Sequence, residues 1–80
     1  SRRPGTITIQ VASLKDPEIA AKMVTELIKK GYPAYRTSVN IPGKGNWYRV
    51  RIGSYKSKTE ADSMLERLKE EEFRPIVVKE

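Results

Sequence analysis

The chain of 80 residues contains no cysteine and no histidine. The absence of cysteine excludes a disulfide framework, and the absence of both residues excludes structural zinc sites built from them. Catalysis by Ser-His-Asp or Cys-His arrangements, and by the usual zinc hydrolases, is excluded for the same reason. We therefore expect a binding module that is not an enzyme and needs no metal or cofactor.

Long apolar runs are also missing. The longest have three or four residues, whereas a membrane-spanning helix needs about 20. No signal peptide opens the chain. We expect a single domain over residues 7–80, preceded by a linker over residues 1–6, with no direct membrane contact and a monomeric state.

The charge of the chain is unevenly distributed. The net charge is +6, which favours an anionic partner. Residues 44–58 contain five basic residues and no acidic one, whereas residues 59–80 contain four basic and seven acidic residues. The excess positive charge is therefore concentrated in the middle of the chain.

A shift of 41 positions aligns the two halves of the sequence without a gap. The segment VASLK at Val11–Lys15 falls on IGSYK at Ile52–Lys56, and Ala20 falls on Ala61. Each half has the pattern of a strand, a helix and a second strand. We therefore predict a duplicated βαβ unit.

Alternation of apolar and polar residues predicts strands over 7–13 and 47–53, each buried on one face only. A less regular strand is predicted over 34–39, and a fourth strand over 75–79. The two glycines and one proline within residues 40–46 predict a flexible hairpin loop.

Capping signals define two helices. Asp16 is the predicted N-cap of the first helix, with Pro17 in its first turn, and Gly31 is its predicted left-handed stop. Ser57 begins the second helix, and Glu60 completes a capping box. The apolar stripes expected to face the core are Ile19, Ala20, Met23, Val24, Leu27 and Ile28 in the first helix, and Ala61, Met64, Leu65 and Leu68 in the second.

The order β-α-β-β-α-β predicts an α+β fold of the RNP or ferredoxin-like type, in which a four-stranded antiparallel sheet has both helices on one face. The other face of the sheet is then open. Strict alternation places Thr8, Gln10 and Ala12 of the first strand on that face. We expect the third strand to add Trp47, Arg49 and Arg51, the outer strands to add the equivalent positions Arg36 and Val77, and no carboxylate to lie there.

Such a face is suited to recognition. The indole ring of Trp47 is a flat apolar platform, and the Gln10 amide and the arginine guanidinium groups donate directional hydrogen bonds. A sugar ring and a nucleobase both fit this chemistry. Glycoside hydrolysis does not, because it requires two carboxylates.

Two segments resemble one family. The run IQVASL at Ile9–Leu14 resembles the "VQ-G-SF" first strand of the SPOR domain, the bacterial sporulation-related repeat, and WYRVRIGSY at Trp47–Tyr55 resembles its "W-R-V-IG-F/Y" third strand. The resemblance spans residues 7–79. The sequence departs from the family pattern at Ala12, where glycine is frequent, and at Leu14, where an aromatic residue is usual.

The resemblance implies a βαββαβ domain that binds peptidoglycan glycan strands lacking stem peptides. It further implies a place in the bacterial cell envelope, where the domain directs a parent protein to the division septum. Glycan contacts are implied for the first and third strands, and a groove-lining residue for the last. With the other residues predicted on the open face, the candidate glycan-binding residues are Gln10, Ser13, Arg36, Trp47, Arg49, Arg51 and Val77.

Purely structural interpretations of these residues stay open. Gln10 fits a solvated position on an open strand, and Ser13 fits a residue that organises the following turn. Trp47 fits equally well a ring that covers the edge of the core. Arg49 and Arg51 fit charges that discourage aggregation of an exposed strand.

Single-stranded RNA binding is the alternative function. RNA-recognition domains share the architecture and stack bases on aromatic residues of the two central strands, and the pI of 9.8 suits them. Here only Trp47 is an outward aromatic residue, so we rank RNA below glycan and expect no nucleic-acid partner. A module whose sheet is covered by another protein is a third interpretation.

Overall fold

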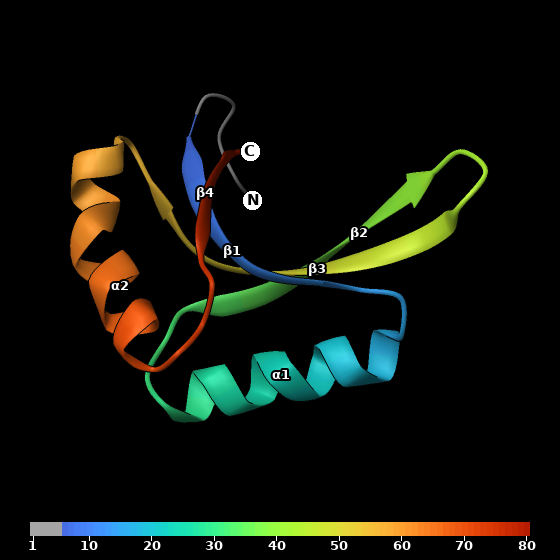
Figure 1. The fold of residues 1–80 in the computed structure, drawn as a ribbon, viewed down its shortest axis with the longest axis horizontal. Helices are drawn as coiled ribbons and strands as arrows, with labels where there is room; N and C mark the ends of the chain where they lie inside the picture. Colours follow the sequence, from blue (N-terminus) through green and yellow to red (C-terminus); the bar gives the residue numbers. More distant parts are fainter. Residues whose placement is uncertain (1–5) are drawn as a thin grey trace.

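The structure, a computed structural model, describes residues 6–80. The predicted α+β fold is confirmed (Figure 1). Residues 1–5 of the predicted linker lie outside the described residues. Its last residue, Thr6, contacts the domain, because its carbonyl accepts the Glu80 N–H at 2.9 Å. The elements are β1 (Ile7–Leu14), α1 (Pro17–Lys29), β2 (Ala34–Ile41), β3 (Gly45–Tyr55), α2 (Lys58–Glu70) and β4 (Ile76–Lys79).

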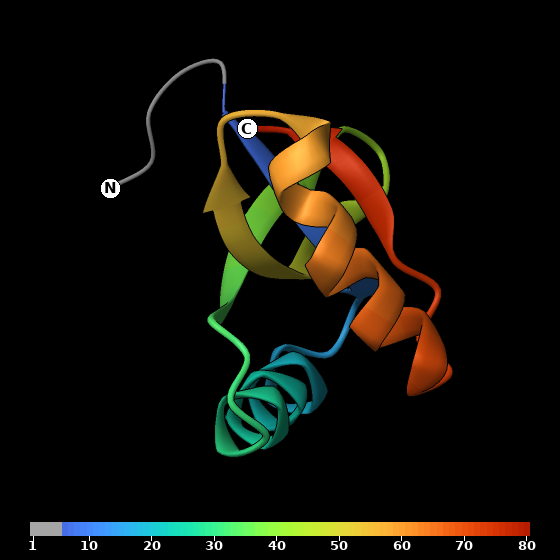
Figure 2. The same ribbon diagram turned by 90° about the vertical axis from the view of Figure 1, so that its left-hand side faces the viewer.

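The four strands form one antiparallel sheet in the order β2-β3-β1-β4. Both helices pack on the same face of it, because the buried side chains of β1 and β3 share one core with those of α1 and α2. Figure 2 shows α1 nearly end-on while α2 crosses the view, so the two helices run in clearly different directions. Within residues 6–80, no helix covers the opposite face. The core comprises Ile9, Ala20, Leu27, Tyr32, Val50, Ile52, Ala61, Leu65 and Leu68.

The helices begin at the predicted caps. The Asp16 carboxylate accepts the Glu18 N–H at 2.8 Å, and the Ser57 hydroxyl oxygen accepts the Glu60 N–H at 3.4 Å. Each cap satisfies a donor that the first helical turn leaves unpaired. The capping signals in the sequence are therefore confirmed as N-caps.

The helices also end alike. The N–H of Tyr32 donates to the Leu27 carbonyl, and the N–H of Phe73 donates to the Leu68 carbonyl, each at 3.0 Å. These four residues are equivalent in pairs under the shift of 41 positions. The same C-terminal turn therefore closes both helices.

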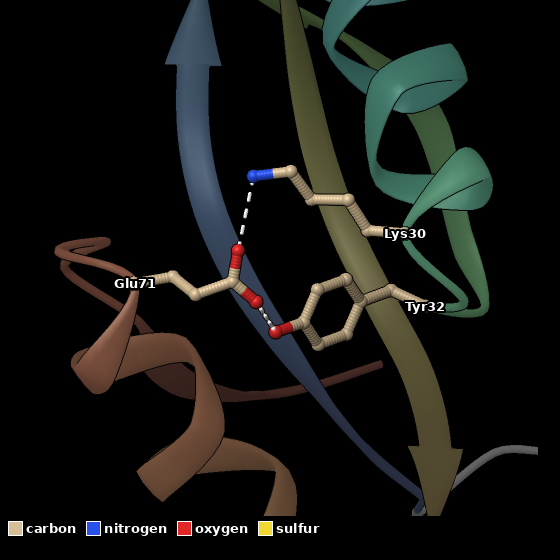
Figure 3. Close-up of polar contacts among 3 residues, drawn as sticks. All are labelled: Lys30, Tyr32 and Glu71. Atoms are coloured by element: carbon tan, nitrogen blue, oxygen red, sulfur yellow. Dashed lines mark hydrogen bonds and ion pairs between the residues drawn. The ribbon is translucent and has the colours of Figure 1, made fainter.

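A polar cluster joins the two helix C-termini (Figure 3). The Glu71 carboxylate accepts hydrogen bonds from Lys30 Nζ at 3.0 Å and from the Tyr32 hydroxyl, and the Arg67 guanidinium lies 4.9 Å from the centroid of the Tyr32 ring. These hydrogen bonds lower the pKa of Glu71 and raise the pKa of both Lys30 and Tyr32. The cluster therefore holds the two helices together through one carboxylate.

The β2–β3 hairpin is longer than predicted. Its ladder extends to the pairs Asn40–Asn46 and Ile41–Gly45, so the connection comprises residues 42–44 rather than 40–46. Gly45, with φ +88°, provides the left-handed conformation that a short hairpin connection requires. The hairpin consequently projects beyond the rest of the sheet (Figure 1).

The inner stripe of α1 is narrower than predicted. Ile19 and Ile28 are 52% and 55% exposed. They lie on opposite flanks of the line through Ala20 and Leu27, which are buried against the sheet. Of the two helices that the structure describes, neither has the length and apolar character needed to cross a membrane.

Candidate functional site on the open face of the sheet

The register of the sheet gathers most of the predicted site residues. Trp47, Arg49 and Arg51 alternate along β3 with Val50 and Ile52, which are completely buried on the helix side. The three therefore point to the open face. Their cross-strand neighbours there are Gln10 and Ser13 of β1 and Tyr35, Thr37 and Val39 of β2.

A β-bulge decides which residues of β1 face outward. Between Gln10 and Ala12, β1 advances by two residues where β3 advances by one. This bulge inverts the alternation over the rest of the strand. The prediction that Ala12 faces outward is therefore wrong, because Ala12 pairs with the buried Val50 and packs against the core. Ser13 instead joins Gln10 on the open face, although the two are three positions apart.

Arg36 and Val77 do not lie on the open face, and their predicted placement is wrong. Val77 pairs with the buried Ile9 and packs against the core. Arg36 pairs with the buried Val50, and its Nη1 donates to the Pro17 carbonyl at 3.0 Å. The repeat correctly makes the two positions equivalent, but their pairing with the central strands turns both to the helix side.

The open face carries hydrogen-bond donors. Arg51 Nε donates to Gln10 Oε1 at 3.2 Å. Within residues 6–80, Trp47 Nε1 and Arg49 Nε are buried atoms without a hydrogen-bond partner. Lys15 Nζ lies 5.9 Å from the centroid of the Trp47 ring and adds a positive charge beside it. The chemistry of this surface therefore suits a ligand rich in oxygen acceptors.

The aromatic residues of β3 divide between the two faces. Tyr48 pairs with Leu14 on the helix side and packs against the core. Tyr55 also packs there, and burial raises its pKa. Trp47 is half-buried but does not belong to the core cluster of the described residues. The position of its ring therefore favours a surface role over a place at the edge of the core.

One end of the open face is closed by a polar group that the sequence analysis missed. The Tyr35 hydroxyl lies 2.7 Å from Thr8 Oγ1 and 2.8 Å from Glu80 Oε1, and the Ser54 hydroxyl donates to Glu80 Oε2 at 3.2 Å. The prediction that no carboxylate lies on this face is therefore wrong, because Glu80 follows β4 and contacts Tyr35. Thr8 is completely buried beneath this group and presents no surface to a ligand. Residues 6–80 contain no group of three or more side chains that could hold a metal ion.

Comparisons with known proteins agree with this architecture. The SPOR domain family model matches residues 3–79, so the chain belongs to the SPOR domain family. A similar solved structure is the peptidoglycan binding domain of the B. subtilis cell wall lytic enzyme CwlC, determined in solution. It is 28% identical with a TM-score of 0.69, and the match covers 100% of this chain and 95% of that one. No curated protein matches the chain.

Proposed function

We propose that this SPOR domain binds peptidoglycan through the open face of its sheet. Its ligand in this proposal is the glycan strand freed of stem peptides, and its role is to direct the protein that carries it to the division septum of the bacterial cell envelope. Recognition is noncovalent, and the domain acts as a monomer in dilute solution. The likeness to the peptidoglycan binding domain of CwlC supports the ligand class.

The observation that carries the proposal is the convergence of five side chains on one face. An indole ring, two guanidinium groups, an amide and a hydroxyl meet there from two strands. Two of the donors, Trp47 Nε1 and Arg49 Nε, lack a partner among the described residues. An unpaired buried donor costs about 1–3 kcal/mol, so a small movement of either side chain that brings its donor to a ligand oxygen is favoured. The open-face site comprises Gln10, Ser13, Trp47, Arg49 and Arg51.

Each residue of the open-face site has a chemical role in this proposal. The Trp47 ring lies against the apolar face of a sugar. Gln10 and Arg49 donate hydrogen bonds to N-acetyl, hydroxyl or lactyl carboxylate oxygens. Ser13 and Arg51 shape the groove between β1 and β3.

Selectivity for stripped glycan follows from shape and charge. A stem peptide occupies the lactyl carboxylate and keeps the strand from lying flat on the sheet. Removal of the peptide frees an anionic group for Arg49 and the nearby Lys15. Salt should therefore weaken binding moderately, and less steeply than it weakens binding to nucleic acid.

Co-sedimentation with purified sacculi tests the proposal. The assay compares untreated sacculi with sacculi stripped of stem peptides by an amidase, and Trp47 fluorescence reports binding independently. We expect retention on stripped sacculi only. Arg49→Ala should weaken it by roughly 10- to 100-fold, which corresponds to the loss of a charged hydrogen bond.

Arg36→Ala is the matched control, because it removes the same side chain from the opposite face of the neighbouring strand. It should leave retention unchanged. Equal losses in both variants would contradict a site on the open face. No retention on either kind of sacculus, together with a change in Trp47 fluorescence when single-stranded RNA is added, would establish the alternative function instead.

A further inference from the structure

The two edge strands of the sheet differ in how they are protected from further pairing. β4 has four residues, follows Pro75 and ends at Lys79, and shortness, proline and lysine all discourage pairing with another strand. β2 has eight residues, contains no proline or lysine, and pairs with β3 without a register shift over its whole length. Within residues 6–80, β3 is its only neighbouring strand. β2 is therefore a long, regular and unprotected edge.

The one charge on β2 is directed away from this edge. The Arg36 guanidinium donates to the Pro17 carbonyl at 3.0 Å and lies 5.3 Å from the centroid of the Tyr48 ring. Both contacts lie on the helix side of the sheet. The strand thus carries no charged side chain on its open face, and its one charge is held on the helix side.

The flank of α1 next to this edge has an uncharged centre. The hydrogen bond from Arg36 to Pro17 marks the side of the helix that lies nearest β2. Helical spacing places Ala21, Thr25 and Ile28 on that flank, and all three are exposed. Glu18 and Lys29 lie beside Thr25 at the border of that flank, whereas Lys22 and Glu26 point away from it.

We propose that β2 pairs antiparallel with β2 of a second copy of this domain, about a two-fold axis normal to the sheet. Two strongly basic chains repel each other least where they meet through a surface of few charges, and β2 with the uncharged centre of the α1 flank provides one. A two-fold contact requires a surface that is complementary to itself. The edge of a strand meets this requirement in antiparallel pairing, because its backbone N–H and C=O groups pair with those of an identical strand.

The register of such a pair is restricted by the faces of the sheet. Residues opposite each other must share a face, so the axis passes beside a residue and not between two. Pairing over the greatest length of β2 places it beside Thr37 or Ser38. With the axis at Ser38, Thr37 lies opposite Val39 and Arg36 opposite Asn40.

The dimer would contain one eight-stranded sheet with a continuous open face. Both open-face sites would then point to the same side, so a long polymer could engage them together with a gain in avidity. This consequence depends on the proposed function, whereas the association itself does not. The monomeric state that we expect from the sequence would then hold only in dilute solution.

Sedimentation of the free domain from about 10 μM to about 1 mM tests the association without any ligand. We expect a mass of 9.1 kDa at the dilute end and growth toward twice that value at the concentrated end. Ser38→Lys places two like charges at the axis and should raise the dimer Kd at least tenfold. Ser63→Lys is the matched control, because it adds the same charge at an exposed position of α2 and should change nothing.

Amide hydrogen exchange identifies the strand involved. Amides of β2 should gain protection as concentration rises, while those of β4 should not. A 9.1 kDa species at every concentration would overturn the proposal. An unchanged dimer in Ser38→Lys, or concentration-dependent protection in β4 instead of β2, would overturn it equally.

Discussion

The two halves of the chain agree in their helices and differ in their outer strands. Ala20 and its equivalent Ala61 are both completely buried, and Leu27 and its equivalent Leu68 are at most 1% exposed. In contrast, β2 has eight residues and β4 has four. Each helix begins at a cap within its own half, whereas β2 is extended by the hairpin that joins it to β3. The duplication therefore preserves the core and leaves one long edge.

Where the halves meet, equivalent positions contact each other. Gln10 and Arg51 are paired in the central strands and joined by a hydrogen bond of 3.2 Å. Lys30 and Glu71 form an ion pair of 3.0 Å. In a strictly symmetric repeat each of these residues would meet its own kind, and two lysines would repel each other. The halves must therefore differ at the positions where they touch.

The largest effect is expected where the central strands differ, at Ala12 and its equivalent Gly53. Gly53 has φ +72°, and a Cβ atom there would lie 2.5 Å from the Tyr55 ring. Gly53→Ala should lower the free energy of unfolding by about 3 kcal/mol, since strain and overpacking add. Urea denaturation measures the change.

Gly43→Ala is the control for this prediction. Gly43 has φ +80°, but a Cβ atom there would meet nothing within 4 Å. It should cost only about 1 kcal/mol, which is the cost of the left-handed backbone alone. Similar losses of stability in the two variants would mean that Tyr55 moves aside freely. Alanine would then be tolerated at position 53 as it is at the equivalent position 12.

Local signals explain what could be predicted from the sequence. Asp16 and Ser57 act within one helical turn, so the helix starts needed no knowledge of the rest of the chain. The repeat then supplied the strand order. The outward placement of Trp47, Arg49 and Arg51 followed from regular alternation along β3, which holds over that segment.

What could not be predicted depends on contacts between distant segments. The bulge beside Ala12 shows only in the pairing of β1 with β3, and no residue there is diagnostic of it. The helix-side placement of Arg36 and Val77 depends on the register of the outer strands. Glu80 reaches the open face only because β4 lies next to β1, which brings the end of the chain to Tyr35.

A smaller effect is expected at the helix ends, where Gly31 is equivalent to Glu72. Both adopt a left-handed conformation, with φ of 95° and 71°. Glu72→Gly should raise the free energy of unfolding by about 0.5–1 kcal/mol, because glycine adopts this conformation without strain. Gly31→Ala should lower it by about 1 kcal/mol, since a Cβ atom there meets nothing within 4 Å and only the backbone is strained.

Thermal denaturation of the two variants measures whether each substitution raises or lowers the stability. Opposite shifts of the melting temperature would show that the two turns are equivalent in energy as well as in hydrogen bonding. A loss of stability in Glu72→Gly would contradict this equivalence, and would mean that the Glu72 side chain contributes more than its backbone costs.

The smallest effect is expected in the pH dependence of the contact between Lys30 and Glu71. Hydrogen bonds from Tyr32 and Lys30 hold the pKa of Glu71 below its ordinary value of 4.5, so the stabilisation is present above that pH and is lost as pH falls through the lowered pKa. The pKa values of Tyr32 and Lys30 are raised above their ordinary values of 10.0 and 10.5. Their contribution to the stability of the fold is therefore present below pH 10 and is lost as pH rises through the raised pKa values. Stability should therefore be greatest between these two limits.

Glu71→Gln removes the charge on which both limits depend. The urea midpoint of the unchanged protein should fall at both ends of the range from pH 3 to pH 11. In Glu71→Gln this fall should be smaller at each end. Glu66→Gln is the matched control, because it removes the same charge from an exposed ion pair of 3.6 Å within α2. The effect should be small, since Lys30 is largely solvated and exposed ion pairs contribute little. Identical pH profiles for the two variants would mean that the contact between Lys30 and Glu71 contributes nothing to holding the halves together.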